Sequence, residues 1–185
     1  MTEEELRRFL PPGLVHNRLE AAQNRPAAVL VPLEPERGVW MTRRSAKMPS
    51  HAHQVSFPGG KIEPGDASAE AAALREAWEE VGLNPDEAEI LGRMDDYVTS
   101  TGFHIVPVVA LVPKGVRLVA APREVQEVFR LPFETLLDKD QPRLRRAFLR
   151  GTAYEFLVWP HERHVIWGAT AAILYKLAKR LRGEA

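Results

Sequence analysis

Three glutamates in one short stretch have the residue type and spacing to bind divalent cations. In the run REAWEE, Glu76, Glu79 and Glu80 stand at positions i, i+3 and i+4. On a helix of about 100° per residue, their side chains spread over about 100° of one flank. Like charges this close repel one another unless cations lie among them. Such hard oxygen ligands suit Mg²⁺ or Mn²⁺, which keep positions open for water and phosphate oxygens. The pattern therefore predicts a metal site that acts on a polyphosphate.

A helix that presents these glutamates needs an apolar flank to hold it against a sheet. Ala77, Trp78 and Val81 fall within about 60° of Leu74, on the side opposite the glutamates. We therefore expect this flank, centred on Leu74, to pack on a sheet.

The bounds of this helix are marked by residues that favour helix ends. Asp66 or Ser68 is a suitable N-cap, and Gly82 a suitable C-terminal stop. Arg75 lies four residues before Glu79 and is expected to orient a carboxylate. A solvated, glutamate-rich surface helix is the alternative for REAWEE alone, and the Gly-Gly loop before it favours the metal site.

The stretch GGKIEPGDASAEAAALREAWEEVGL resembles the Nudix box, GX5EX7REUXEEXGU, in which U is aliphatic. The matching positions are Gly60, Arg75, Glu76, Glu79, Glu80 and Gly82. Asp66 stands where the box has Glu, and the gap from Asp66 to Arg75 is one residue longer than the general pattern. Both departures are typical of the coenzyme A pyrophosphatase branch of that superfamily.

A second resemblance to this branch lies upstream of the box, where its signature is approximately LLTxRSxxLRxHxGxVxFPGG. The matching residues are Met41, Thr42, Arg43, Arg44, Ser45, His51, Gln54, Val55, Phe57, Pro58, Gly59 and Gly60. Pro49 stands where Arg is usual and His53 where Gly is usual. The resemblance covers residues 26–133 and recurs near Trp167. It implies an α/β fold, the Nudix α/β/α sandwich with a mixed β-sheet.

The resemblance also implies the roles of the residues in the box. We expect Glu76 and Glu80 to be the principal metal ligands, with the Gly60 carbonyl as a third. Glu79 would ligate the metal or help to activate water. Superfamily members often supply one further acid from outside the box, as a ligand or general base. Glu124 is the candidate here and Glu127 the reserve, and a surface acid near a turn is the alternative.

Substrate contacts are expected from residues on either side of the box. Arg43 and Arg44, with Ser45, end a predicted strand and could reach a phosphate, although a solvated strand end is equally consistent. Phe57 belongs to the upstream signature, and Phe103 follows a Ser/Thr loop that could touch substrate or simply form a turn. His51 and His53 would make a two-histidine metal site only if further ligands lay nearby.

Composition limits the class of protein. The chain has 185 residues, a hydrophobic content of 45% and a formal net charge of +0, which fits one domain and gives no sign of a nucleic-acid binder. We expect a single domain over 1–185, with an N-terminal extension at 1–25 and a C-terminal helix at 163–182. The absence of cysteine excludes disulfides and is consistent with a cytoplasmic location. No signal-like or membrane-spanning run is evident.

The order of apolar runs predicts the remaining elements. Expected strands lie at 26–33, 38–44, 88–95, 105–112 and 117–120, with a hairpin over 143–149 and 154–159 that turns at 150–151. Expected helices lie at 3–10 and 165–181, with a helical turn at 132–137. Residues 97–101 are expected to form a polar loop.

These features leave three functional hypotheses. The first is hydrolysis of coenzyme A to 3′,5′-ADP and 4′-phosphopantetheine, which the resemblance implies. The second is hydrolysis of another nucleoside diphosphate compound, such as ADP-ribose, NADH or a dinucleoside polyphosphate. The third is a catalytically silent module that binds nucleotide. We expect a small nucleotide as the ligand and no nucleic acid or membrane partner, and we allow for a homodimer.

Overall fold

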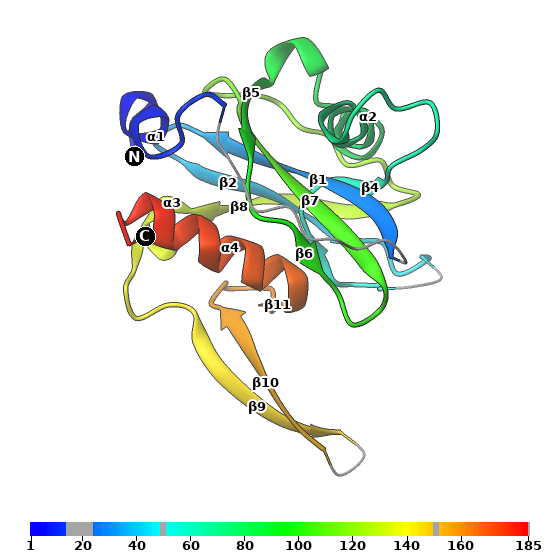
Figure 1. The fold of residues 1–185 in the computed structure, drawn as a ribbon, viewed down its shortest axis with the longest axis vertical. Helices are drawn as coiled ribbons and strands as arrows, with labels where there is room; N and C mark the ends of the chain where they lie inside the picture. The colour runs from blue at the N-terminus through cyan, green and yellow to red at the C-terminus, as the bar shows by residue number, and fades with distance from the viewer. Residues whose placement is uncertain (14–23, 49–50, 150–151, 185) are drawn as a thin grey trace.

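Two helices enclose a central mixed sheet. The computed structural model describes residues 1–13, 24–48, 51–149 and 152–184. Helix α2 (Ala69–Val81) covers one face of the sheet, and helix α4 (Gly168–Leu181) lies across the other (Figure 1). This arrangement confirms the predicted α/β fold with a mixed sheet.

The strands of the central sheet pair around β1 (Arg25–Glu34). The main path has the order β3 (Val55–Ser56), β2 (Gly38–Arg44), β1, β7 (Phe103–Leu111) and β5 (Glu89–Arg93). Three further strands pair with members of this path, namely β4 (Gly59–Lys61) with β1, β6 (Tyr97–Val98) with β7 and β8 (Val125–Pro132) with β2. Strands β1 and β7 are parallel, and the remaining described pairs are antiparallel. Since helices cover both faces, β1 and β7 read as nearly continuous apolar runs.

Two short helices and a second sheet complete the chain. Helix α1 (Glu3–Phe9) has a capping box between Thr2 and Glu5, and α3 (Phe133–Leu137) follows β8 directly. A 3₁₀ turn, η1 (Pro85–Glu87), follows α2. Strands β9 (Arg143–Leu149), β10 (Thr152–Trp159) and β11 (Ile166–Trp167) form the second sheet, whose β9–β10 hairpin projects from the body (Figure 1). No described helix is both long and apolar enough to cross a bilayer.

The structure corrects several predicted elements. The strand expected at 117–120 is wrong: this segment is irregular, and the Val119 N–H donates to the Val81 carbonyl at 2.9 Å. The helix expected from 165 begins at Gly168, because Ile166 and Trp167 pair with β10. Strand β6 lies in the expected polar loop, and β8 had no predicted counterpart. The proposed hairpin turn at 150–151 lies outside the described residues.

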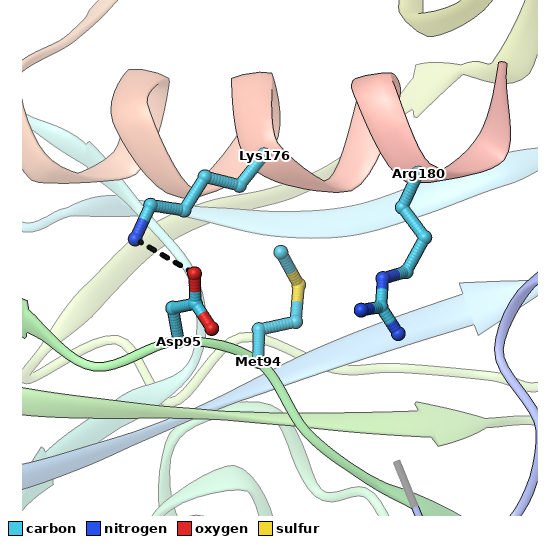
Figure 2. Close-up of a pocket in the computed structure, with 4 residues that line it drawn as sticks. All are labelled: Met94, Asp95, Lys176 and Arg180. Carbon is cyan, nitrogen blue, oxygen red and sulfur yellow. Dashed lines mark ion pairs between the residues drawn. The ribbon is translucent and has the colours of Figure 1, made fainter. Parts of the chain in front are cut away.

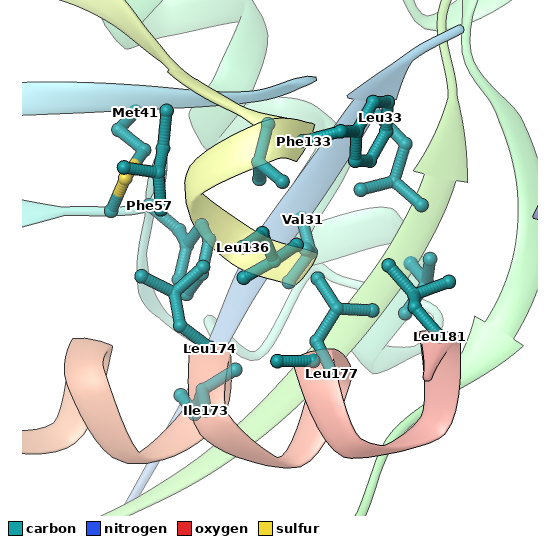
Figure 3. Close-up of a cluster of buried hydrophobic side chains, with 14 of the residues drawn as sticks. Val31, Leu33, Met41, Phe57, Phe133, Leu136, Ile173, Leu174, Leu177 and Leu181 are labelled. Carbon is teal, nitrogen blue, oxygen red and sulfur yellow. The ribbon is translucent and has the colours of Figure 1, made fainter. Parts of the chain in front are cut away.

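The two faces of the sheet have different cores. On the α4 side, large side chains from the sheet, α3 and α4 form one cluster (Figure 3), including Leu33, Met41, Phe57, Leu136, Leu174 and Leu177. On the α2 side, the helix contributes small residues, including Ala69, Ala72, Ala73 and Ala77. Small side chains allow the backbone of α2 to lie close to the sheet.

Candidate active site

Helix α2 packs on the sheet through only part of the predicted flank: Ala77 and Val81 are fully buried, but Trp78 is not. Trp78 is 56% exposed, whereas Ala73, Ala77 and Glu80 are buried. The centre of the buried face is therefore turned by about 90° from Leu74. The predicted packing of Trp78 is wrong, because the alanine side of the helix fits the sheet more closely than a flank bearing an indole could. One consequence is that Glu80 faces the protein interior.

Glu80 is the most buried of the three glutamates, with 3% of its surface exposed. Its Oε2 accepts a hydrogen bond from the Gly59 N–H at 3.1 Å, and Arg44 Nη1 lies 3.8 Å from its Oε1. Burial raises the pKa of Glu80 to about 7, and the charges of Glu76 and Glu124 act in the same direction. Burial therefore outweighs the Gly59 hydrogen bond and the charge of Arg44, which both act to lower this pKa.

Glu76 lies directly against the glycine loop. A Cβ added at Gly60 would come within 2.5 Å of Glu76 Oε1, so a larger residue would displace the carboxylate from this position. Burial raises the pKa of Glu76 above its ordinary value, and Glu79 and Glu124 contribute in the same direction. The loop and α2 therefore bring Gly60 and two raised-pKa glutamates together.

Arg75 holds the acidic groups around it in place. Its guanidinium donates to both oxygens of Asp66 at 3.0 Å and to the Lys61 carbonyl at 3.1 Å. It also donates to Glu76 at 3.1 Å and Glu79 at 3.4 Å. Asp66, the acid that departs from the Nudix pattern, is thus the bidentate partner of Arg75.

Of the two acids proposed from outside the box, only Glu124 acts on the glutamates. Its charge contributes to the raised pKa values of Glu76 and Glu80, and its carbonyl accepts from the Ser45 N–H at 2.8 Å. Glu127 instead forms an ion pair with Arg163 at 2.5 Å, and its Oε2 lies 3.2 Å from His164 Nε2. The geometry therefore favours Glu124 over Glu127.

A cavity of about 570 Å³ opens beside the glycine loop. Arg44, Phe57 and Phe103, which the sequence pointed to as substrate contacts, line this cavity together with Gly60. Phe103 also stacks under Arg25, whose guanidinium carbon lies 4.0 Å from the ring centroid. Three of the five predicted substrate contacts therefore line a single cavity.

Two predicted substrate contacts lie elsewhere. Arg43 is not among the described residues that line the cavity, and its Nη2 lies 3.4 Å from His53 Nδ1. Ser45 is buried, and its hydroxyl accepts from the Lys47 N–H at 3.3 Å. The pairing of β2 with β8 has a register shift between Arg43 and Arg44, and the two side chains have different partners, His53 and Glu80. Ser45 therefore takes part in a turn.

Sequence reasoning missed the wall of the cavity that comes from the C-terminal part of the chain. Trp167, Thr170 and Ile173 line the cavity from β11 and the start of α4. The Thr170 hydroxyl donates to the Val55 carbonyl at 3.0 Å and fixes the helix start to the sheet. The family-like run around Trp167 was a signal, but helical periodicity suggested only a closing core helix.

Two other features do not form a comparable site. A pocket of about 70 Å³ lies between Met94 and α4, where Lys176 Nζ is 3.5 Å from Asp95 (Figure 2). It has room for a few water molecules only. His51 bonds to Gln54 at 2.8 Å rather than joining His53 at a metal centre. Within the described ranges, no three His, Cys, Asp or Glu side chains have metal-cluster geometry, and Arg44 and Arg75 approach the glutamates instead.

The sequence and fold match known proteins. Residues 23–151 match the family model of the NUDIX domain. A Photorhabdus laumondii protein named as an uncharacterized Nudix hydrolase, NudL, is 38% identical over 161 residues, which cover 86% of each chain. An Escherichia coli protein of the same name is 37% identical over 164 residues, covering 88% of this chain and 85% of its own.

Solved structures share the fold at low identity. DR0079 from Deinococcus radiodurans aligns with a TM-score of 0.54 and 16% identity, over 81% of this chain and 80% of its own. An Ap4A hydrolase from C. elegans aligns with a TM-score of 0.50 and 19% identity, over 58% of this chain and 80% of its own.

Proposed function

The chain belongs to the Nudix family of hydrolases, which act on pyrophosphate bonds, and we propose that its substrate is coenzyme A. Hydrolysis of the diphosphate would release 3′,5′-ADP and 4′-phosphopantetheine. Other nucleoside diphosphate compounds are the competing substrates.

One observation carries the catalytic part of the proposal. Glu80 is 3% exposed, and its pKa is raised to about 7 beside the backbone of Gly59. A buried carboxylate in this state costs folding free energy. A carboxylate kept at this cost is expected to have a function, and binding a cation beside Glu76 is such a function.

The donor set fits a hard divalent cation. Glu76 and Glu80 offer carboxylate oxygens, and Gly60 brings its backbone against Glu76. Nudix hydrolases generally use divalent metal ions, and all-oxygen donors favour Mg²⁺ or Mn²⁺. When bound, such ions neutralise the diphosphate oxygens and favour attack by water.

The remaining polar residues position these groups. Arg75 holds Glu76 and Glu79 by hydrogen bonds, so that neither carboxylate has to reorganise when substrate arrives. Glu79, with a side chain 55% exposed, is placed to ligate or to accept a proton from water. Glu124 is the candidate general base because it lies outside α2 yet acts electrostatically on Glu76 and Glu80.

We favour coenzyme A over other substrates because of the upstream signature. Phe57 and Arg44 of that signature both line the cavity. The departures at Pro49 and His53 keep ADP-ribose, NADH and dinucleoside polyphosphates as alternatives, and a fold neighbour is an Ap4A hydrolase. Pro49 lies outside the described residues.

A substrate panel tests the proposal. Initial rates are measured for coenzyme A, ADP-ribose, NADH and diadenosine tetraphosphate at equal concentration, each with Mg²⁺ and with Mn²⁺. We expect the highest kcat/KM for coenzyme A, with 3′,5′-ADP and 4′-phosphopantetheine as products. Faster turnover of ADP-ribose with weak turnover of coenzyme A would reject coenzyme A while retaining the hydrolase.

Three expectations about the whole chain stay predictions. A homodimer would be detected by light scattering coupled to size-exclusion chromatography. A cytoplasmic location would be tested by cell fractionation. Single-domain behaviour over 1–185 predicts one cooperative unfolding transition.

A further inference from the structure

A cationic side chain continues the floor of the cavity at the start of β1. Alternate residues of a strand point to the same face, so Arg25 lies on the same face of the sheet as Ala27 and Val29, which line the cavity. Phe103 of β7 is the strand partner of Arg25 and lines the cavity as well. Arg25 therefore stands immediately beyond the cavity floor formed by Ala27 and Phe103.

The guanidinium of Arg25 is held in a fixed plane. Its central carbon lies 4.0 Å from the centroid of the Phe103 ring, and its Nη2 donates to the Thr101 carbonyl at 2.9 Å. Among the described residues, this carbonyl is the one acceptor bound by the side chain. A guanidinium has five N–H donors, so donors at its edge stay available for a forked pair with a phosphate.

A second cation lies on the same face. Lys61 of β4 is the strand partner of Ala27, and partners across antiparallel strands point to the same side. Lys61 is thus a diagonal neighbour of Arg25, at about 7–8 Å. Within the described ranges, neither cation has an acidic partner, and no Asp or Glu lines the cavity. Like charges on neighbouring strands repel, and an anion between them would remove this cost.

Hydroxyl groups complete this end of the cavity. Thr99, Ser100 and Thr101 line it from the turn before β7. The turn is fixed beside Phe103, whose N–H donates to the Thr99 hydroxyl at 2.9 Å, and the Thr99 and Thr101 hydroxyl oxygens lie 3.0 Å apart. Hydroxyls can donate to phosphate oxygens. Two cations and a set of hydroxyls therefore form an end that suits an anion.

This end is close to the glutamates of α2 but separate from them. Lys61 follows Gly60 directly, and Gly60 lies against Glu76. From Ala28, the strand partner of Gly60, to Arg25 is a distance of about 10 Å along β1. An anion bound by Arg25 is therefore a different group from the diphosphate that is cleaved beside Glu76.

Coenzyme A, the substrate of the proposed function, has such a second anionic group. Its ribose carries a 3′-phosphate, a monoester with a charge of about −1.5 to −2 at pH 7. ADP-ribose, NADH and diadenosine tetraphosphate have no phosphate monoester. A site for this group would therefore distinguish coenzyme A from the competing substrates.

We propose that Arg25 and Lys61 bind the 3′-phosphate of coenzyme A, with Arg25 as the specificity-determining residue. The Arg25 guanidinium forms the forked pair, and Lys61 contributes a second positive charge between this phosphate and the glycine loop. This assignment rests on the proposed function, and it adds the group of the substrate that the chain selects.

Turnover of two substrates that differ only in this phosphate tests the assignment. Coenzyme A and dephospho-coenzyme A are compared in the full-length wild-type protein and Arg25→Ala, both with Mg²⁺. The wild type should have the higher kcat/KM for coenzyme A. Arg25→Ala should lower kcat/KM for coenzyme A at least tenfold, mainly through KM, and leave that for dephospho-coenzyme A within twofold.

Calorimetric titration provides a readout that does not depend on turnover. 3′,5′-ADP and AMP, which also differ only in the 3′-phosphate, are titrated into the same two proteins. Arg25→Ala should weaken 3′,5′-ADP binding about tenfold and leave AMP binding within twofold. The wild-type preference for 3′,5′-ADP should decrease as ionic strength rises, because salt screens the ion pair.

Two further variants control for folding and for general charge effects. Arg25→Lys keeps the charge but loses the planar fork, so the preference for coenzyme A should be intermediate. Arg117→Ala removes an exposed guanidinium that does not line the cavity, so both substrates should behave as in wild type. If Arg25→Ala does not fold, a loss restricted to coenzyme A in Arg25→Lys supports the assignment, and an unchanged preference overturns it.

The outcomes separate the 3′-phosphate site from the function. Equal effects of Arg25→Ala on both substrates, or no wild-type preference between them, overturn the site while coenzyme A turnover keeps the function. If the wild type does not cleave coenzyme A, the proposed function fails and the titrations decide the site alone. Tighter binding of 3′,5′-ADP than of AMP that is lost in Arg25→Ala then supports the site, and equal binding overturns it.

Discussion

The two helix-covered faces of the sheet use opposite packing chemistry. On the α4 face, Leu174 and Leu177 are fully buried in a cluster of large apolar side chains. On the α2 face, Ala73 and Ala77 bring the helix backbone close, and Glu80 is buried at the same interface. The α4 face stabilises the fold through large apolar contacts. The α2 face has less apolar contact and holds a carboxylate beside the glycine loop.

This contrast assigns different consequences to mutations on the two faces. Large apolar side chains contribute through the area and volume that they fill, so their loss affects unfolding. The α2 residues also set where Glu76 and Glu80 lie, so changes there affect chemistry as well. Mutations on the α4 face should therefore change stability without changing turnover, whereas mutations on the α2 face should change both.

Removal of the buried charge on the α2 face should have the largest effect. Glu80→Gln keeps the shape of the side chain but removes a ligand charge, so kcat should fall by about 100-fold or more. Steady-state turnover of coenzyme A at saturating Mg²⁺ measures this. Retention of most activity would mean that the metal site has been misplaced.

The same substitution should increase stability in metal-free buffer. The pKa of Glu80 is raised from 4.5 to about 7 in the folded state, so ionisation favours the unfolded chain, and the cost grows as pH rises through this interval. We expect Glu80→Gln to raise the free energy of unfolding by about 1–2 kcal/mol at pH 8 and to have little effect at pH 4. Denaturant titrations with chelator at both pH values test the sign.

Truncation on the α4 face should act on stability alone. Leu177→Ala creates a cavity in the large apolar cluster and should cost about 3 kcal/mol of unfolding free energy. Its kcat, measured per folded molecule at a temperature below the transition, should match wild type. A large fall in kcat would show that α4 packing also controls the site.

Overpacking one alanine on each helix makes a matched pair. Ala77 of α2 and Ala178 of α4 are both fully buried, and each substitution by leucine should cost about 1–3 kcal/mol. Ala77→Leu should also lower kcat about tenfold by displacing the glutamates, since small misplacements reduce catalysis. Equal kcat values in the two variants would contradict the proposed role of close packing at α2.

The smallest expected effect concerns an ion pair at the start of α2. Arg93 bonds to Glu70 and lowers its pKa to about 2. A lowered pKa contributes stability above the ordinary value of 4.5, and this contribution is lost as pH falls through about 2. Because the Glu70 side chain is 29% exposed, solvent screens part of this interaction, and Glu70→Gln should cost only about 1 kcal/mol at pH 7.

Thermal unfolding at pH 7 and pH 2 checks this prediction. The difference between Glu70→Gln and wild type should be present at pH 7 and largely lost at pH 2. Glu162→Gln, at an exposed position, is the control and should match wild type at both pH values.

The sequence was most informative where local pattern and chemistry coincide. The strand ending in Arg44, the helix ending at Gly82 and the hairpin strands follow from apolar runs and capping residues, and the structure has them. The strand at 117–120 failed because a short apolar run pairs with the end of α2 instead of a sheet. Trp78 was misplaced because periodicity identifies an apolar flank but not the flank that fits most closely.

The sequence alone gives the order and spacing of Glu76, Glu79 and Glu80, and helical geometry converts this spacing into the directions of the side chains. The sequence does not give their different degrees of burial, because burial depends on how closely α2 approaches the sheet and the glycine loop. Only the tertiary structure placed Trp167 and Phe103 in the lining of one cavity, because strand pairing and the placement of α4 join segments that are distant in the chain.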